Sequence, residues 1–216
     1  MSHTLLVHCR IQAQKLSQWI TRNDLSRAWF ASTSASAAID AEIRQANHKH
    51  KGRILVKTSE KAGVGFGVYA LQSFKENDFL FQAYITEDSL AAMSHSIQVD
   101  WSRHVKIDLP GRFLNHSCEA NVAAKSNSKA DVAYDFVATK PIASGEELFF
   151  DYDTTEYEIS SPFHCACGSS QCRRVIRGFK YSRNDVIDAY GEDNVASYLM
   201  NEQEHSWCKR KDITIS

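Results

Sequence analysis

From Arg53 onward, the chain is a series of short runs rich in β-branched and aromatic residues. Residues that favour turns separate these runs, a pattern typical of many short strands and not of alternating strands and helices. This part of the sequence therefore predicts a mostly β (α+β) fold. The runs are RILVKTSE at 53–60, GFGVYALQ at 65–72, FLFQAYI at 79–85, HVKIDL at 104–109, VAYDFVAT at 132–139 and ELFFDYD at 147–153.

Helical patterns flank this region on both sides. One helical spacing of apolar residues ends at Ile20, and a second covers 37–47. Between them, STSASAA at 32–38 favours a loosened linker. Near the other end, apolar stripes at 186–190 and 195–199 again have helical spacing. We therefore expect an N-terminal helical accessory region and a C-terminal helical tail.

Composition limits the classes of partner. The chain has 216 residues and 43% hydrophobic residues, enough for one sizeable core. Its formal net charge of -1 argues against a general cationic field, so no clear direct nucleic-acid binding is expected. A membrane-spanning helix needs roughly 20 apolar residues in a row. The sequence shows no such run, and no membrane partner is expected.

The first residues carry a faint targeting signal. The start of the chain has basic residues but no acidic residue before Asp24, and serines follow at 32–36. This composition faintly resembles an organelle transit peptide, although an ordinary basic helix is the better explanation. An intracellular location, in the nucleus or cytoplasm, is expected, with organelle targeting as the alternative.

A close set of cysteines predicts a metal site. HCACGSSQC at 164–172 places Cys165, Cys167 and Cys172 in a C-x-C-x4-C pattern. Thiolates packed this closely repel one another unless a cation joins them, and tetrahedral zinc is the natural choice. Structural zinc usually has four ligands. We expect Cys118 to be the fourth, with His164 or Cys208 as the alternatives.

Two glycine- and asparagine-containing stretches suggest a ligand site. In GVGFGVYA at 63–70, Gly65 and Gly67 flank Phe66, and glycine lets the backbone approach a ligand closely. A tight turn between strands is the simpler alternative. In RFLNHSCEAN at 112–121, Asn115 and His116 offer donors and acceptors suited to a nucleotide-like ligand. A hydrogen-bonded loop would explain that pair as well.

A pair of aromatic residues follows in GEELFFDYD at 145–153. Phe150 and Tyr152 lie on one face of the expected strand by its period of two. Two such rings are usually part of a core. A buried phenol, however, needs a hydrogen-bond partner, which marks Tyr152 as a candidate for function.

In this order, GFGVYA, RFLNHSCEAN, GEELFFDY and the cysteine pattern resemble the SET-domain lysine methyltransferase family with its post-SET zinc motif. The resemblance covers roughly 53–180. It implies a SET-domain fold of small curved sheets with a C-terminal pseudoknot, in which the Asn-His and Phe-Tyr segments meet. The implied organisation is a helical accessory region at 1–52, a SET domain at 53–160, a post-SET zinc segment at 161–180 and a helical tail at 181–216.

The resemblance also implies roles for individual residues. Three positions depart from the family pattern: Thr86 replaces a glycine in YITE, Ala120 replaces a proline, and Asn77 stands where a turn glycine is common. The implied catalytic residue is Tyr152. Tyr84 and Phe150 would line the substrate channel, S-adenosylmethionine would be bound by Gly65, Phe66, Gly67, Arg112, Phe113, Asn115 and His116, and zinc by Cys118, Cys165, Cys167 and Cys172.

The function implied is S-adenosylmethionine-dependent methylation of a lysine amine in a histone or another protein. The substrate amine is expected to lose its proton to water, without a dedicated base. Phenylalanine at 150 leaves room for a di- or trimethylated product. Two alternatives stay open: methylation of a free amine or small metabolite, and a SET-like scaffold without catalytic activity.

Overall fold

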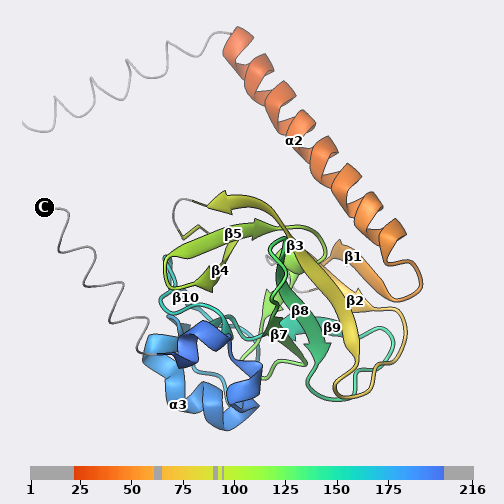
Figure 1. Cartoon of the computed structure of the whole chain (residues 1–216). Coiled ribbons are helices and arrows are strands. Elements are labelled where there is room, and N and C mark those ends of the chain that lie inside the picture. Colours follow the sequence, from red (N-terminus) through yellow and green to blue (C-terminus); the bar gives the residue numbers. More distant parts are fainter. Residues whose placement is uncertain (1–21, 61–64, 90–91, 94, 202–216) are drawn as a thin grey trace, which may run out of the picture. The chain divides into compact units, whose positions relative to one another are not determined.

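The computed structural model describes residues 22–60, 65–89, 92–93 and 95–201. It divides the chain into two compact units, Met1–Arg44 and Gln45–Ser216. Among the described residues, no helix is both long and apolar enough to span a membrane. The helical spacing that ends at Ile20 lies outside the described residues. The site discussed below lies entirely within the second unit (Figure 1).

The first described element is helix α2, Arg22–Lys49. The loosened linker expected at 32–38 is wrong, because this stretch lies inside the helix. Alanine is the strongest helix former, and serine costs only a few tenths of a kcal/mol more per residue. The serines therefore do not interrupt a segment in which alanine alternates with them.

Nine strands form one mixed sheet (Figure 1), and each of the six runs from Arg53 onward overlaps one of them. The strands are Ile54–Thr58 (β1), Phe66–Ala70 (β2), Phe79–Ser89 (β3), Ser96–Asp100 (β4), Arg103–Ile107 (β5), Asn115–His116 (β6), Val122–Ser126 (β7), Val132–Ala138 (β8) and Glu147–Phe150 (β9). Their order is β1-β2-β9-β7-β8-β3-β5-β4, and β6 pairs with β9 beside this path. The mostly β fold is confirmed.

The pairing of β6 with β9 builds the centre of the site. It is parallel, with Asn115 opposite Phe149 and His116 opposite Phe150. The side chain of Asn121 also binds the backbone of β9. Its side chain accepts from the Phe149 amide at 2.8 Å and donates to the Glu147 carbonyl at 2.9 Å. The two segments expected to meet, 30 residues apart in sequence, therefore lie side by side.

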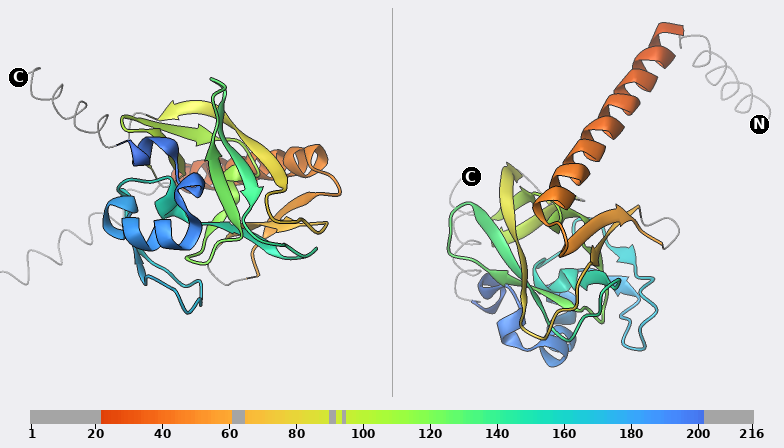
Figure 2. Two further views of the ribbon diagram at one scale, coloured as in Figure 1. Left: turned by 60° about the horizontal axis from the view of Figure 1, so that its bottom comes forward. Right: turned by 90° about the vertical axis from the view of Figure 1, so that its right-hand side faces the viewer.

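The remaining elements cover one end of the second unit (Figure 2). A small antiparallel pair, β10 (Phe163–His164) and β11 (Val175–Ile176), follows the sheet. Helix α3 spans Phe179–Tyr190. Four short 3-10 turns complete the unit: η1 (Gly111–Phe113), η2 (Tyr152–Thr154), η3 (Glu192–Asn194) and η4 (Ser197–Met200).

Aromatic packing ties the core of the sheet to the site. Phe81 of β3 and Phe136 of β8 are fully buried, with ring centroids 5.0 Å apart. Phe136 in turn contacts Phe150 of β9 edge-on at 5.7 Å. The core therefore holds Phe150 rigidly at the edge of the site.

The turn that contains Asn77 has the backbone conformation expected from the sequence. Asn77 adopts a φ of 67°, the left-handed conformation that asparagine tolerates in place of glycine.

Candidate active site and cysteine cluster

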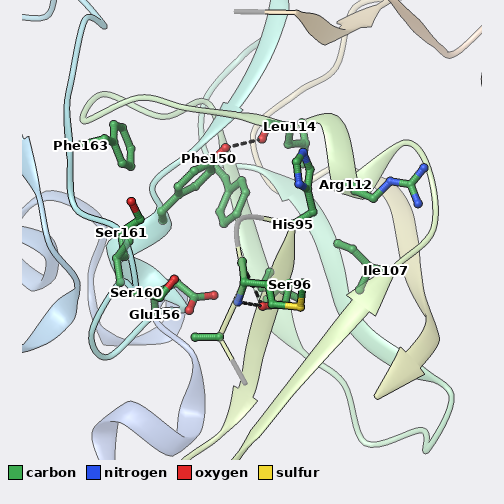
Figure 3. A pocket seen from close by; sticks show the side chains of 16 residues that line it. His95, Ser96, Ile107, Arg112, Leu114, Phe150, Glu156, Ser160, Ser161 and Phe163 are labelled. Atoms are coloured by element: carbon green, nitrogen blue, oxygen red, sulfur yellow. Dashed lines mark hydrogen bonds between the residues drawn. The ribbon is translucent and has the colours of Figure 1, made fainter. Parts of the chain in front are cut away.

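A pocket of about 270 Å³ lies where β4, η1, η2 and residues 159–163 come together. Its walls include Arg112, Leu114, Phe150, Tyr152, Glu156 and Phe163, drawn in Figure 3. Three of these are aromatic, and further isoleucine side chains make most of the lining apolar. A concave, largely apolar pocket with a few converging polar groups is the usual form of a ligand site.

Tyr152 is held in a single orientation within this pocket. Its hydroxyl donates to the Leu114 carbonyl oxygen at 2.9 Å. Its ring lies 4.8 Å from that of Phe150 and 6.0 Å from that of Phe163. Burial of the phenol raises its pKa above the ordinary value of 10, so the hydroxyl keeps its proton at neutral pH. Tyr152 can therefore orient a ligand but cannot readily act as a base.

His116 connects Tyr152 to the cysteines. Its Nδ1 accepts from the Tyr152 amide at 3.2 Å, which leaves the proton on Nε2. Nε2 lies 3.4 Å from the Cys118 sulfur and is placed to donate to it. Burial lowers the pKa of His116 to about 4, so the ring is neutral. Both ring nitrogens thus have protein partners, and the backbone of His116 pairs with β9.

The other residues expected to bind the cofactor form a second cluster beside β2. Asn115 donates through Nδ2 to the Phe66 carbonyl at 3.0 Å and to Glu147 Oε1 at 2.9 Å. The rings of Phe66 and Phe113 stack at 5.0 Å. A Cβ at Gly67 would come within 2.5 Å of Glu147 Oε1, so a larger residue there would require the Glu147 side chain to move.

The predicted cofactor residues therefore fall into two groups. Arg112 lines the pocket described above. Phe66, Gly67, Phe113 and Asn115 instead contact one another and Glu147. Gly65 has a φ of +81°, and a Cβ there would meet no atom of the described residues within 4 Å.

Tyr84 lies on β3, and it is not among the described residues that line the pocket. Its hydroxyl donates to Gln82 Oε1 at 2.9 Å, and Lys49 Nζ lies 4.6 Å from the centre of its ring. Gln82 and Tyr84 are two residues apart on one strand, so they share a face. A role for Tyr84 in a substrate channel stays a prediction.

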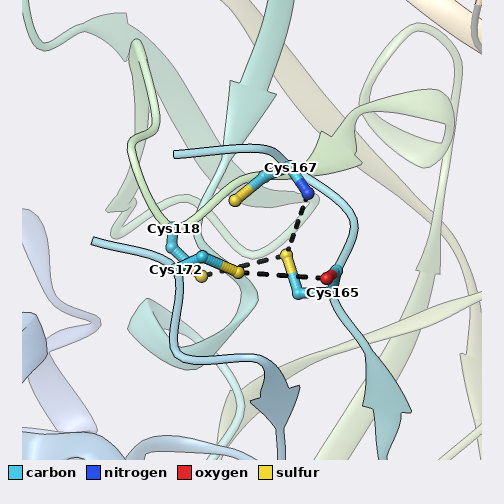
Figure 4. Close-up of side chains that lie close together, drawn as sticks. All are labelled: Cys118, Cys165, Cys167 and Cys172. Atoms are coloured by element: carbon cyan, nitrogen blue, oxygen red, sulfur yellow. Dashed lines mark hydrogen bonds between the residues drawn. The ribbon is translucent and has the colours of Figure 1, made fainter. Parts of the chain in front are cut away.

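Four cysteines meet at one point (Figure 4). Cys118, Cys165, Cys167 and Cys172 place their sulfur atoms within 4.8 Å of one another. The Cys118 and Cys165 sulfurs are 3.9 Å apart. A zinc ion with Zn–S bonds of about 2.3 Å requires sulfurs roughly 3.8 Å apart at tetrahedral corners. Of the alternatives for the fourth ligand, His164 is exposed on β10, and Cys208 lies outside the described residues.

The surroundings of the sulfurs fit a bound cation. The Arg173 amide donates to Cys118 Sγ and the Cys167 amide to Cys165 Sγ, each at 3.4 Å. Hydrogen bonds of this kind stabilise thiolate ligands. Burial meanwhile raises the pKa values of the Cys118 and Cys165 thiols, because a buried negative charge is costly. Hydrogen bonds from neighbouring groups lower the pKa of Cys167 to about 6, so the four sulfurs offer a mixed set of thiols and thiolates that a bound cation would complete.

A buried ion network links this cluster to the Tyr152 segment. Arg173, next to Cys172, donates to Asp151 Oδ1 at 2.6 Å and to Asp153 Oδ2 at 3.1 Å. Asp153 also accepts from the Gly178 amide and the Ser182 hydroxyl. Nothing in the local sequence around Asp151 and Asp153 identifies this partner. Only the fold brings Arg173 to them.

Glu156 is a further pocket residue that sequence reasoning missed. Its side chain is 13% exposed, and its Oε1 accepts from the Gln98 amide at 2.8 Å. Burial, which outweighs that hydrogen bond, raises the pKa of Glu156 from 4.5 to about 7. A carboxyl group that titrates near neutral pH inside a pocket is typical of functional sites. In the sequence, TTEYE had no local pattern that marked it.

Residues 65–153 match the family model described as "SET domain". The match begins at Gly65 and ends just after Tyr152, so it contains β2, the paired β6 and β9, and most of the pocket wall. Residues 65–153 therefore match a SET domain, and the chain is similar in sequence to proteins named as histone-lysine N-methyltransferases. The four-cysteine cluster that follows this domain is consistent with a post-SET zinc motif.

Individual relatives agree with this class. The "Histone-lysine N-methyltransferase, H3 lysine-36 specific" of Candida albicans is 31% identical over 143 residues, which cover 57% of this chain and 17% of that protein. "Methyltransferase flvH" of Aspergillus flavus is 33% identical over 79 residues, covering 36% of this chain and 42% of that protein. The crystal structure of KRYPTONITE in complex with mCHG DNA and SAH has a TM-score of 0.45 and 23% identity, and it covers 57% of this chain and 29% of that one. The chain spans less than half the length of each.

Proposed function

We propose that the chain is an S-adenosylmethionine-dependent protein-lysine N-methyltransferase. One observation supports it most: in a SET domain, the Tyr152 hydroxyl is held on the Leu114 carbonyl at 2.9 Å inside an aromatic pocket. Two oxygens fixed in one place can orient a polarised methyl group through weak C–H···O contacts.

The cofactor would supply a methyl group activated by the positive charge of a sulfonium sulfur. Arg112, the 113–116 backbone and the turn at Gly65 would hold it. The open space beside Gly65 supports this assignment, since a backbone there can approach a ligand without a Cβ in the way. The rings of Phe150, Tyr152 and Phe163 complement a cation, each contact contributing about 0.5–2 kcal/mol.

The pocket also favours the reactive form of the substrate amine. Lysine has a pKa of about 10.4, so only about one molecule in a thousand is uncharged near pH 7. An apolar lining such as Ile97, Ile107 and Phe150 makes the ammonium form costly and lowers that pKa. The same walls exclude water and hold the amine in line, and reacting atoms kept about 3–3.5 Å apart gain a large rate advantage.

Phe150 is proposed to set the degree of methylation. It is buried against Phe136 and Tyr152, and its ring has no hydroxyl to bind a water molecule at the pocket wall. The space left would admit an amine that already carries a methyl group. We therefore propose di- or trimethyl-lysine as the product.

Zinc is proposed to bind at Cys118, Cys165, Cys167 and Cys172 as a structural ion. The cluster joins the segment after β6 to residues 165–172, directly beyond Phe163 of β10. Fixing these segments together would keep Phe163 beside Tyr152 and close the pocket on that side. Structural zinc in small sites contributes directly to folding.

The substrate proposed is a lysine-bearing protein. A relative named as a histone-lysine N-methyltransferase makes histones the first candidates, which would place the protein in the nucleus.

Methyl transfer from labelled S-adenosylmethionine to histones, other proteins and small amines would test the proposed function. We expect transfer to a protein lysine. Tyr152→Phe should lower the rate about 2–5-fold or more, because it removes one oxygen that orients the methyl group through a C–H···O contact of about 0.5–1 kcal/mol. Tyr181→Phe is the matched control, because its exposed hydroxyl bonds Glu158 outside the pocket. Equal rates for the Tyr152 variant and the unmodified chain would refute the role of Tyr152. Transfer to a small amine alone would refute the protein substrate.

A further inference from the structure

We propose that the Glu156 carboxylate accepts the proton that the substrate ammonium must lose, and that His104 passes this proton on to solvent. The proposal rests on the proposed function. It replaces the expectation that water alone removes the proton, because the structure places a carboxylate in the pocket wall where the sequence indicated none.

Glu156 is positioned firmly enough for this role. Its amide donates to the Tyr152 carbonyl at 2.9 Å, and its own carbonyl accepts from the Phe179 amide at 2.8 Å. The backbone of Glu156 is thus held between η2 and α3, one helical turn beyond Tyr152. Figure 3 shows Glu156 on the same wall as Ser160 and Ser161, across from Ile107 and Arg112. Glu156 and Tyr152 both line this pocket, so an amine bound in it is near both side chains.

One carboxylate oxygen of Glu156 accepts a hydrogen bond from the backbone. The other lies near a histidine nitrogen that has no hydrogen-bond partner among the described residues. Oε1 accepts from the Gln98 amide. Oε2 lies 3.8 Å from Nδ1 of His104, a buried atom with no hydrogen-bond partner among the described residues. A protonated carboxyl group gains a donor, which this unpaired nitrogen can accept after a shift of under 1 Å. The His104 side chain is 16% exposed, so it offers a route to solvent.

The charges around Glu156 keep it a usable base at physiological pH. Burial raises the pKa of Glu156 to about 7, and the negative charge of Asp153 adds to this effect. Burial lowers the pKa of His104, so this ring is neutral and would hold a transferred proton only briefly before releasing it. An acceptor is most effective when its pKa lies near the working pH. The other titratable or charged groups facing Glu156 or the pocket are Asp100, Tyr134, Tyr152 and Tyr198 on the inner side and His95 and Arg112 on the pocket wall.

The step is a simple proton transfer. An N–H bond of the ammonium breaks, an O–H bond forms on Glu156, and the electron pair stays on the nitrogen as the lone pair that methyl transfer requires. The proton then moves to His104 Nδ1, the imidazolium releases the proton on its Nε2 to water, and the Glu156 carboxylate is restored. No oxidant or reductant takes part.

The pH dependence of methyl transfer tests this role. Glu156→Gln keeps an acceptor for the Gln98 amide but cannot take up the proton. We expect its rate to fall about 10²-fold near pH 7.5, within the usual range for general base catalysis. The deficit should shrink toward pH 10, where the substrate amine loses its proton unaided. His104→Gln should show a smaller deficit with the same trend. Glu158→Gln, two residues along and exposed, is the matched control.

A second readout does not depend on turnover. Carbon-13 NMR of the side-chain carboxyls should show one resonance that titrates near pH 7 in the unmodified chain and is missing in Glu156→Gln. A deficit that is equal at every pH, or no deficit, would overturn the proposal while leaving the proposed function intact. Absence of methyl transfer by the unmodified chain to any amine would overturn the proposed function, and this inference with it.

Discussion

Replacing Glu156 with glutamine should stabilise the folded protein, and the gain should grow as the pH rises. Because burial raises the pKa of Glu156 from 4.5 to about 7, the unfolded chain ionises this group at a lower pH than the folded protein does. The stability that the protonated form supports is complete below about pH 4.5 and is lost as the pH rises through about 7. Glutamine is neutral throughout and escapes this loss.

The size of the effect follows from the pKa change. A rise from 4.5 to about 7 corresponds to about 3 kcal/mol at 1.36 kcal/mol per pKa unit. About 2 kcal/mol of this falls between about pH 5.5 and pH 8.5, because part of the loss occurs at lower pH. A gain of this size is large against the 5–15 kcal/mol by which domains are usually stable. The same substitution should lower the rate of methyl transfer, so stability and activity should move in opposite directions.

Urea unfolding at both pH values measures this difference. The unmodified chain and Glu156→Gln carry the same cysteines, so any bound metal affects both alike and cancels in the comparison. Glu158→Gln serves as the exposed control and should show no growing gain with pH. The reasoning would be refuted if the difference in free energy of unfolding between Glu156→Gln and the unmodified chain were the same at both pH values. It would also be refuted if Glu156→Gln became less stable relative to the unmodified chain as the pH rises.

Three further predictions follow from the site. Metal analysis should find one zinc per chain, and Cys118→Ser or a strong chelator should lower the thermal midpoint sharply; metal-free protein with an unchanged midpoint would contradict the zinc site. Arg173→Met should destabilise the fold by about 3–5 kcal/mol in urea unfolding, because it leaves two buried carboxylates without their cation. The exposed Arg177→Met is its control, and similar losses in both would argue against the network. Phe150→Tyr should shift the product toward monomethyl-lysine, since an added hydroxyl narrows the pocket; an unchanged product distribution in mass spectrometry would exclude this role.

Much of the sheet could be predicted from local pattern. The six runs after Arg53 form strands because β-branched and aromatic residues between turn residues favour extended backbone in nearly any context. The strand at 122–126 was missed, because VAAKS is rich in alanine and carries little β preference. It forms a strand because it is buried between β8 and β9. The helix through 32–38 was missed because its serines suggested a linker, although the alanines between them favour a helix.

The cysteine cluster could be predicted from the sequence, because the short spacing of Cys165 and Cys167 already brings their sulfur atoms together. The surroundings of Glu156 and Arg173 could not be predicted in this way. A carboxyl pKa near 7, a guanidinium between two carboxylates and a histidine nitrogen without a partner all depend on how much water the packed elements exclude. Water is excluded because β4, β5, η2 and α3 pack together, and these segments lie up to about 80 residues apart in the sequence. A local sequence pattern therefore cannot predict it.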